Sequence, residues 1–230
     1  MDWGSPWIWL PVLAIGIGLV VWIRIYSSRS RKRDFLANAA ALGFRPALKG
    51  KPLSPTERRL IPLFRSGNSA KFRYVMKHPS GALLFDYQYR FGLPLIASVI
   101  YYQTVAALPV PHDGIPDFCL SPATSVDRVG MKLGISNVAV ESVPEFSSRY
   151  YLRGRDSAAI ASLFTDIGPE WMRIDAGGNL FVEKGGHWLV VYERARVVLP
   201  QFFEAFLQEG SAIADLIMRR RATKTATVMR

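Results

Sequence analysis

The chain has 230 residues, half of which are hydrophobic, and this composition predicts a folded domain and excludes disorder along the whole length. The formal net charge is +11, but ten of the 29 basic residues lie in two short segments, 24–33 and 219–230, that contain no acidic residue. Residues 34–218 keep 19 basic against 17 acidic residues. This domain is nearly neutral, so nucleic-acid binding, which needs a basic face, is not expected.

Residues 1–26 are expected to form an N-terminal transmembrane anchor. The stretch 7–23 carries no charge, and its extension to residue 26 gives about 30 Å of helix, which spans the apolar core of a bilayer. Aromatic rings at both ends, and basic side chains that follow on one side only, are typical of membrane interfaces. The predicted membrane-interface residues are Trp7, Trp9, Trp22, Arg24, Tyr26, Arg29, Arg31, Lys32 and Arg33.

The charges on the two sides of the anchor predict its direction. The basic segment 27–33 follows the span, whereas Asp2 is the only charged side chain before it. The positive-inside rule then places the N-terminus outside and the domain 34–218 in the cytoplasm, on a single-pass protein of the cell (inner or plasma) membrane. The lipid bilayer is therefore an expected partner. Ala14 and Gly18 form a small-xxx-small pair that would allow a homodimer through the anchor.

One helix and three strands are expected early in the domain. Residues 34–42 are rich in Ala and Leu and end before a glycine, as helices with a glycine C-cap do. Ser54, followed by a proline, marks the start of a short helix. Alternating apolar residues over 71–77 and 83–90 predict an antiparallel hairpin, and the more apolar stretch 98–108 predicts a third strand beside it.

The middle of the domain gives weaker signals. Four prolines in 109–122 indicate a loop with one short strand, and this loop would be the boundary if the domain were divided into two lobes. A brief helix is expected over 126–133 and a strand over 146–153. Asp156 has the position of an N-cap for the next helix, and Pro169 is expected to lie beyond the end of that helix.

The last part of the domain contains the clearest hairpin. The dipeptide Gly185-Gly186 predicts a two-residue turn between strands 180–184 and 187–192. The predicted cross-strand pairs are Lys184 with His187, Val182 with Leu189, and Leu180 with Val191. Pro200 then opens an amphipathic helix that should cover the sheet, and residues 219–230 are expected to be a basic, disordered tail. The predicted fold class is α+β, with antiparallel hairpins or a meander packed against a few helices.

The sequence predicts no catalytic, cofactor-binding or metal-binding residues. His78, His112 and His187 lie more than four residues from one another and from Cys119, so they lack the spacing of a metal motif. No Gly-x-Gly-x-x-Gly, Walker A or Gly-x-Ser-x-Gly sequence is present. The single cysteine is expected to be buried and unreactive. Four tyrosines are expected in the core rather than on a base-stacking platform: Tyr87, Tyr89, Tyr101 and Tyr102.

Several segments of the last 75 residues carry a family resemblance. The run 146–156, the pair Leu163-Phe164, the Gly-Gly hairpin and the last helix together resemble uncharacterised single-pass, membrane-anchored bacterial proteins. This resemblance implies an anchored chain with a domain of unknown function. It implies no activity.

These features favour a non-enzymatic, cytoplasm-facing interaction or scaffold module, which the anchor holds at the membrane near a protein partner. Two alternatives stay open. The first is an enzyme that acts on a membrane-derived substrate, and its polar groups would be His78, Asp86, Glu183 and His187. The second is binding of anionic lipid or RNA by the tail, and its cations would be Arg219, Arg220 and Arg221.

Overall fold

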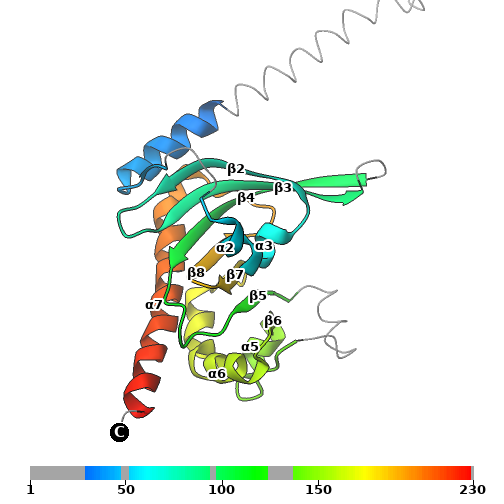
Figure 1. Cartoon of the computed structure of the whole chain (residues 1–230), viewed down its shortest axis with the longest axis vertical. Helices are drawn as coiled ribbons and strands as arrows, with labels where there is room; N and C mark the ends of the chain where they lie inside the picture. Colours follow the sequence, from blue (N-terminus) through cyan, green and yellow to red (C-terminus); the bar gives the residue numbers. More distant parts are fainter. Residues whose placement is uncertain (1–28, 48–51, 94–96, 124–136, 229–230) are drawn as a thin grey trace, which may run out of the picture.

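The structure is a computed structural model, and it describes residues 29–47, 52–93, 97–123 and 137–228 (Figure 1). The following predicted features lie outside these residues: the anchor with Trp7, Trp9, Trp22, Arg24 and Tyr26, the pair Ala14 and Gly18, and the helix expected over 126–133. Within the described ranges, no helix has both the length and the apolar character needed to cross a membrane.

Eight strands of the described chain form one sheet, in the order β1-β2-β3-β4-β8-β7-β5-β6. The strands are β1 (Arg45–Pro46), β2 (Asn68–Lys77), β3 (Leu83–Leu93), β4 (Ala97–Pro109), β5 (Phe118–Pro122), β6 (Tyr150–Gly154), β7 (Leu180–Gly185) and β8 (Trp188–Glu193). All neighbouring strands are antiparallel. The β7–β8 hairpin lies between β4 and β5, so the sheet continues without a break across the segment 109–122. The α+β class with an antiparallel sheet is confirmed.

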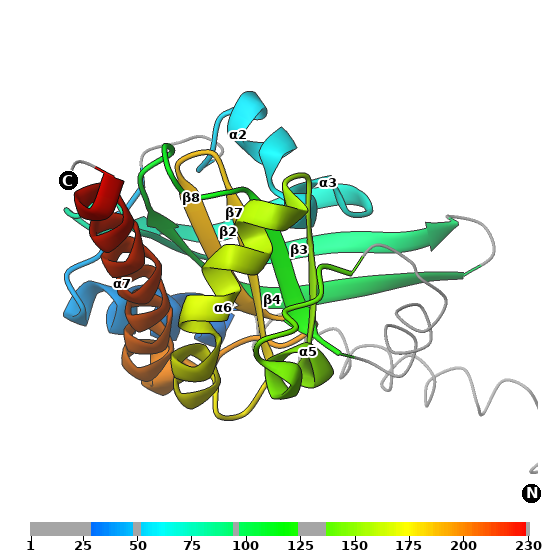
Figure 2. The ribbon, with the colours of Figure 1, turned by 90° about the horizontal axis from the view of Figure 1, so that it is seen from below.

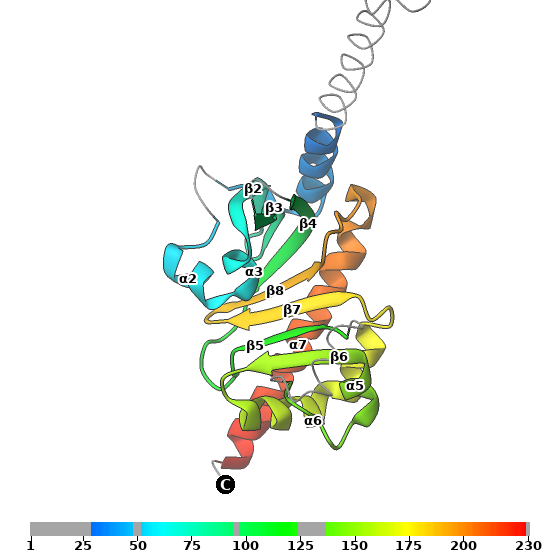
Figure 3. The same cartoon turned by 90° about the vertical axis from the view of Figure 1, so that its right-hand side faces the viewer.

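Helices cover the two faces of the sheet unequally. One face carries a helix over residues 29–41, α5 (Pro144–Arg149), α6 (Ser157–Ile174) and α7 (Phe203–Val228), which is preceded by the 3₁₀ turn η1 (Pro200–Phe202) (Figures 1 and 2). Apolar side chains from these helices and from the sheet form the larger core, in which Phe35, Phe164, Trp171 and Phe203 have no exposed surface. The short helices α2 (Pro55–Leu60) and α3 (Pro62–Arg65) cover a smaller core on the opposite face (Figure 3).

The local signals of the first half are confirmed. β2 and β3 pair with Phe72 opposite Tyr87, and β4 lies beside β3. The helix over residues 29–41 contains most of the predicted segment and ends at Gly43, whose φ of +83° is the left-handed conformation of a glycine C-cap. Ser54 caps α2 in a reciprocal capping box with Glu57.

Two expectations around α6 are corrected by the structure. The strand expected over 146–153 begins only at Tyr150, because Pro144 opens α5 at its first helical position. Asp156 does cap α6 through a hydrogen bond from the Ala159 backbone, but Pro169 lies inside the helix rather than beyond it. Buried apolar side chains on both sides of this proline, including Trp171, hold the helix together across the missing hydrogen bond.

The Gly-Gly hairpin forms with the predicted faces but with a different register. Lys184 lies opposite Leu189, Val182 opposite Val191 and Leu180 opposite Glu193, so the pairing is displaced by two residues. Gly186 and His187 form the turn, and Gly185 stays in the strand opposite Trp188. A Cβ atom at Gly185 would lie 2.7 Å from the Leu60 carbonyl oxygen. The glycine in the strand therefore serves the close approach of α2, and the turn moves one position along.

The C-terminal segment also differs from the expectation. Residues 219–228, expected to belong to a disordered tail, continue α7 as far as Val228. Two acidic side chains one turn apart on α6 contact the beginning of this segment. The Arg219 guanidinium lies 3.5 Å from the Glu170 carboxylate, and Arg220 donates a 2.6 Å hydrogen bond to Asp166. These ion pairs join α7 to α6 at residues 219 and 220.

Candidate functional site

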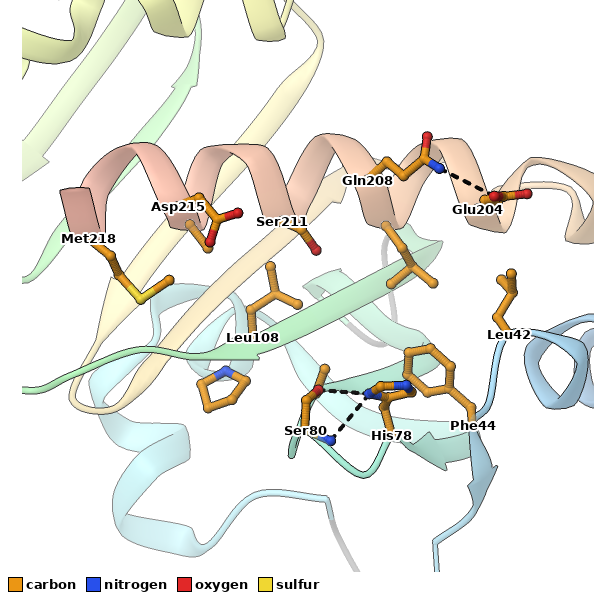
Figure 4. Close-up of a pocket in the computed structure, with 14 residues that line it drawn as sticks. Leu42, Phe44, His78, Ser80, Leu108, Glu204, Gln208, Ser211, Asp215 and Met218 are labelled. Carbon is orange, nitrogen blue, oxygen red and sulfur yellow. Dashed lines mark hydrogen bonds between the residues drawn. The ribbon is translucent and has the colours of Figure 1, made fainter.

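A groove of about 500 Å³ lies between α7 and the β2–β3 turn, and we call it the α7 groove (Figure 4). Its walls come from four parts of the chain that are distant in sequence: the end of the first helix, the β2–β3 turn, the end of β4, and α7. The residues that line it are Leu42, Phe44, His78, Ser80, Ala82, Leu108, Pro109, Glu204, Leu207, Gln208, Ser211, Ala214, Asp215 and Met218. Its volume falls within the range of ligand-binding clefts.

One wall of the groove is a stripe along α7. The stripe runs from Glu204 to Met218, and the fourteen steps between these two residues span about 21 Å of helix. The adjacent stripe, with Phe203, Ile213 and Ile217, is buried against the sheet and fixes the rotation of the helix. The groove therefore follows from the amphipathic pattern of α7, because one side of its apolar stripe lies beyond the edge of the core.

The opposite wall is the turn between β2 and β3. The backbone N–H of Ser80 donates to His78 Nδ1 over 3.2 Å, and the Ser80 hydroxyl lies 2.8 Å from the same nitrogen. Since Nδ1 accepts from the backbone, the neutral imidazole carries its proton on Nε2. The His78 ring packs on Phe44 with 5.1 Å between the ring centroids. These contacts hold the imidazole at the edge of the groove rather than free in solvent.

Apolar side chains dominate the floor of the groove, and acidic groups stand on its helical wall. At Gly210, α7 packs directly on the sheet, since a Cβ at this position would lie in ordinary contact with Leu108, at 3.5 Å. Glu204 accepts a hydrogen bond from Gln208 over 3.2 Å. Among the described residues, neither Glu204 nor Asp215 forms a salt bridge. The site thus offers an apolar channel with two unneutralised carboxylates on one side.

The polar groups of the enzyme alternative do not share a cleft. His78 lines the α7 groove, whereas His187 lies exposed in the β7–β8 turn, with its ring 5.2 Å from that of His112. Asp86 is buried on the face of the sheet that α6 and α7 cover, and there it binds Arg31. Glu183 is buried on the opposite face and accepts hydrogen bonds from a backbone N–H and from a tyrosine hydroxyl. The structure therefore separates these four residues.

Further buried polar groups have structural partners. Lys184 is 1% exposed, and its ammonium donates to Asp117 over 2.7 Å and to the Ile115 carbonyl over 2.8 Å. Burial raises the pKa of the Glu183 carboxyl, although the hydrogen bonds that it accepts oppose this shift. Burial, and then the nearby Glu183 carboxylate, raise the pKa of the Cys119 thiol to about 12. A thiol with such a pKa is a poor nucleophile near neutral pH. Within the described residues, no cluster of metal-binding side chains is found.

A second hollow of about 300 Å³ lies beside the N-terminal half of α7, lined in part by Glu193, Phe202 and Glu209. Burial, together with repulsion from Asp175 and Glu193, raises the pKa of the Glu209 carboxyl to about 7. Asp175 is itself buried and hydrogen-bonded to the Tyr150 hydroxyl. The carboxyl of Glu209 therefore changes its protonation near neutral pH.

The predicted membrane-interface residues within the described chain divide into two groups. Arg29, Lys32 and Arg33 are exposed on the first helix, as a membrane-facing role requires. Arg31 instead turns toward the sheet and binds the Asp86 carboxylate over 2.7 and 2.8 Å. Its side chain is 20% exposed.

The sequence alone does not identify the groove. Glu204, Gln208 and Asp215 stand out only as the polar stripe of an amphipathic helix, which is the usual solvent-facing pattern. The side chains that face them belong to a turn more than 120 residues earlier in the chain.

Comparisons with known proteins support the fold. No protein-family model matches the sequence, and no curated protein matches it. Among solved structures, the chain is similar to the crystal structure of the mycobacterial trehalose monomycolate transport factor A, TtfA, with a TM-score of 0.53 and 11% sequence identity. The similarity covers 82% of this chain and 95% of that chain. A likeness at this identity shows that the two chains share an α+β fold with an antiparallel sheet.

Proposed function

We propose that this chain is a membrane-anchored interaction module whose α7 groove holds an amphipathic, basic segment of a partner protein. The observation that carries this proposal is the groove itself, an apolar channel beside a helix with unneutralised carboxylates. The expected partner segment is a helix that lays apolar side chains into the channel and directs Lys or Arg toward α7.

The dimensions of the groove suit such a segment. Its wall on α7 is about 21 Å long, which equals four turns of a partner helix. Ser211 and Ala214 are small residues near the middle of this wall, so a second helix can approach closely. Glu204 and Asp215 lie eleven residues apart, about 16 Å along the axis, and each can pair with one cation of the partner.

The predicted anchor and the structural similarity suggest where this module acts. An anchor over residues 1–26 would confine the groove to a membrane surface and raise its effective concentration for partners there. The similar solved structure is that of a trehalose monomycolate transport factor. We therefore propose that the partner belongs to a transport assembly, in which this chain contributes binding.

The alternatives receive less support. An enzyme would need its polar groups in one cleft, whereas His78, Asp86, Glu183 and His187 lie apart. The basic-tail alternative needs free cations at the C-terminus, whereas Arg219 and Arg220 lie in ion pairs with α6.

Matched variants of the full-length chain test the proposal. Ser211→Trp fills the groove at an exposed position, and Gln201→Trp places the same side chain on an exposed site outside it. The probes are two labelled amphipathic helical peptides with the same leucines, one with lysines and one with glutamates. The lysine peptide is expected to bind the wild type and the Gln201→Trp variant and to lose most of its affinity for Ser211→Trp.

Charge reversal separates the role of the acidic wall from that of the apolar floor. The double variant Glu204→Lys, Asp215→Lys is expected to raise the Kd of the lysine peptide about tenfold, or about 1.4 kcal/mol. The same variant should improve binding of the glutamate peptide. Equal affinity of both peptides for wild type, Ser211→Trp and the charge-reversed chain, measured by fluorescence anisotropy, would contradict the proposal.

A further inference from the structure

Strands β3 and β4 extend beyond the rest of the sheet as a two-stranded ribbon (Figures 1 and 2). The pairing of β2 with β3 ends at Arg90, and the pairing of β8 with β4 begins only at Val105. After Arg90 in β3 and before Val105 in β4, the two strands pair with each other, and this pairing reaches Leu93 opposite Ala97. We call residues 90–93 and 97–102 the β3–β4 arm.

The arm exposes large apolar side chains on both of its faces. Phe91 and Val99 lie directly opposite each other on one face, with 55% and 56% of their surface exposed. Ile100 and Tyr102 lie on the other face, with 36% and 42% exposed. The sequence has no charged residue between Arg90 and Asp113. Such a concentration of exposed apolar surface marks a contact site for another phase or molecule.

The two-sided exposure favours a lipid surface over a protein partner. A protein strand that docks on a ribbon pairs with one of its edges, and this pairing alone covers neither face. Lipid surrounds an inserted ribbon on both faces. Beyond Arg90 in β3 and before Val105 in β4, no described strand pairs with the outer backbone edges of the arm. These edges need water, so the arm suits the interfacial layer of a bilayer rather than its centre.

Basic side chains surround the base of the arm. Lys71, Arg90 and Arg194 are exposed there, and the Arg194 guanidinium lies 5.4 Å from the centre of the Tyr101 ring. Cations that flank an inserted apolar segment bind anionic headgroups, and a tyrosine such as Tyr102 fits the level of those headgroups. The charges at the base thus complement an anionic membrane surface.

The arm also lies on the side from which the chain continues toward the predicted anchor. The first described helix begins at residue 29, and Arg31 binds Asp86 of β3. Phe91 follows Asp86 by five residues, about 17 Å along the strand. In Figures 1 and 2, the N-terminal part of the described helix lies nearer the arm than its C-terminal part does.

We propose that the β3–β4 arm is a second membrane contact, which buries Phe91, Val99 and Ile100 in the interfacial layer of the bilayer. This inference does not depend on the α7 groove. The molecule that the arm contacts is lipid. The exposed apolar residues Leu199 and Phe202 near η1 are not part of this proposal, because they lie on a single turn and not on a protruding ribbon.

Site-specific fluorescence quenching in nanodiscs tests the arm. The full-length chain, in a Cys119→Ser background, is labelled at Val99→Cys or, as a control, at Lys77→Cys. Lys77 is exposed at the end of β2, where it pairs with Leu83 at the other end of β3 from the arm. The nanodiscs contain phosphatidylcholine and phosphatidylglycerol, and the quenchers are a nitroxide on the lipid chains and iodide in the water.

The label at position 99 is expected to be quenched by the lipid nitroxide and protected from iodide, and the label at position 77 should show the reverse. The Phe91→Asp substitution should shift the label at position 99 toward the iodide-accessible pattern. Two results would overturn the proposal. One is a label at position 99 that iodide reaches and the nitroxide does not, and the other is a label shielded from both quenchers, which would indicate a protein or a second copy over the arm.

Discussion

Replacement of Arg31 by alanine is expected to destabilise the protein far more than replacement of its neighbour Arg33. Arg31 donates two hydrogen bonds to the Asp86 carboxylate, over 2.7 and 2.8 Å. It also donates to the Val198 carbonyl over 3.2 Å and to the Thr104 hydroxyl over 3.1 Å. One guanidinium therefore ties the first helix to two strands and to the segment before η1.

The structure sets the size of the effect. Loss of one partner from a buried ion pair costs about 3–5 kcal/mol, because the remaining charge is left without compensation. The Arg31 side chain is 20% exposed and the Asp86 side chain is 10% exposed, so the pair is only partly removed from water. Without Arg31, Asp86 would keep the 2.8 Å hydrogen bond that it accepts from Thr104. We therefore expect Arg31→Ala to lower the free energy of unfolding by about 2–3 kcal/mol. Arg33→Ala should lower the free energy of unfolding by less than about 0.5 kcal/mol, because the Arg33 side chain is 80% exposed.

Urea unfolding of the full-length chain in detergent, followed by circular dichroism, measures both variants. A double-mutant cycle with Asp86→Ala should give a coupling energy of about 2 kcal/mol, because each single change removes the same contact. Hydrogen exchange should also become faster in residues 29–41. Equal shifts of the unfolding midpoint for Arg31→Ala and Arg33→Ala would refute the reasoning.

Three further predictions follow from local geometry. Gly154→Ala should destabilise by about 1–3 kcal/mol, because its Cβ would clash with Ile160 and lie 2.6 Å from the Asp117 backbone carbonyl oxygen. Gly168→Ala inside α6 should be neutral or stabilise by up to about 1 kcal/mol in the same unfolding assay. The native Glu209 carboxyl, with a pKa raised to about 7 from its usual 4.5, holds its proton more tightly than the unfolded chain does, so stability should fall between these two pH values as the pH rises. Glu209→Gln should remove this loss, which gives a higher Tm than wild type at about pH 8 and an equal Tm at about pH 4. Cys119, which is half-buried and has a pKa raised to about 12, should react with Ellman's reagent much more slowly in the native chain than in urea, and equal rates would contradict this prediction.

Local chemistry predicts much of this fold from the sequence. The pattern Ser54-x-x-Glu57 contains both halves of a capping box, and the alternation around Phe72 and Tyr87 defines two paired strands. Tyr87 and Tyr89 are in the core as expected, because they belong to the same alternating face. Tyr102 is exposed instead, because it lies in the part of β4 that extends beyond its pairing with β8.

The errors arise where distant segments decide a local choice. Gly185-Gly186 offers two positions for a two-residue turn, and the approach of Leu60 to Gly185 selects between them. The basic residues after Met218 have the composition of a mobile tail, but Asp166 and Glu170 on another helix pair with the first two of them, Arg219 and Arg220. Neither contact can be seen within the segment that it changes. The α7 groove depends on such contacts along its whole length, so the sequence predicts its helix and not the site.

The positions of the arm and the groove determine which part of a partner this chain can bind. The β2–β3 turn and the arm lie at opposite ends of β3, and Leu83 and Phe91 are separated by eight residues, about 26 Å along the strand. The first helix spans the same direction, from Arg31 at its N-terminal end to Leu42 in the groove wall, and its Phe35 ring packs on Phe203 of α7 with centroids 4.7 Å apart. Because helix, strand and α7 are held together by these contacts, the groove cannot swing freely relative to the arm. If the arm touches the bilayer with β3 upright on its surface, the groove lies about 25 Å from that surface, and the partner segment that it takes comes from a water-exposed part of the partner protein.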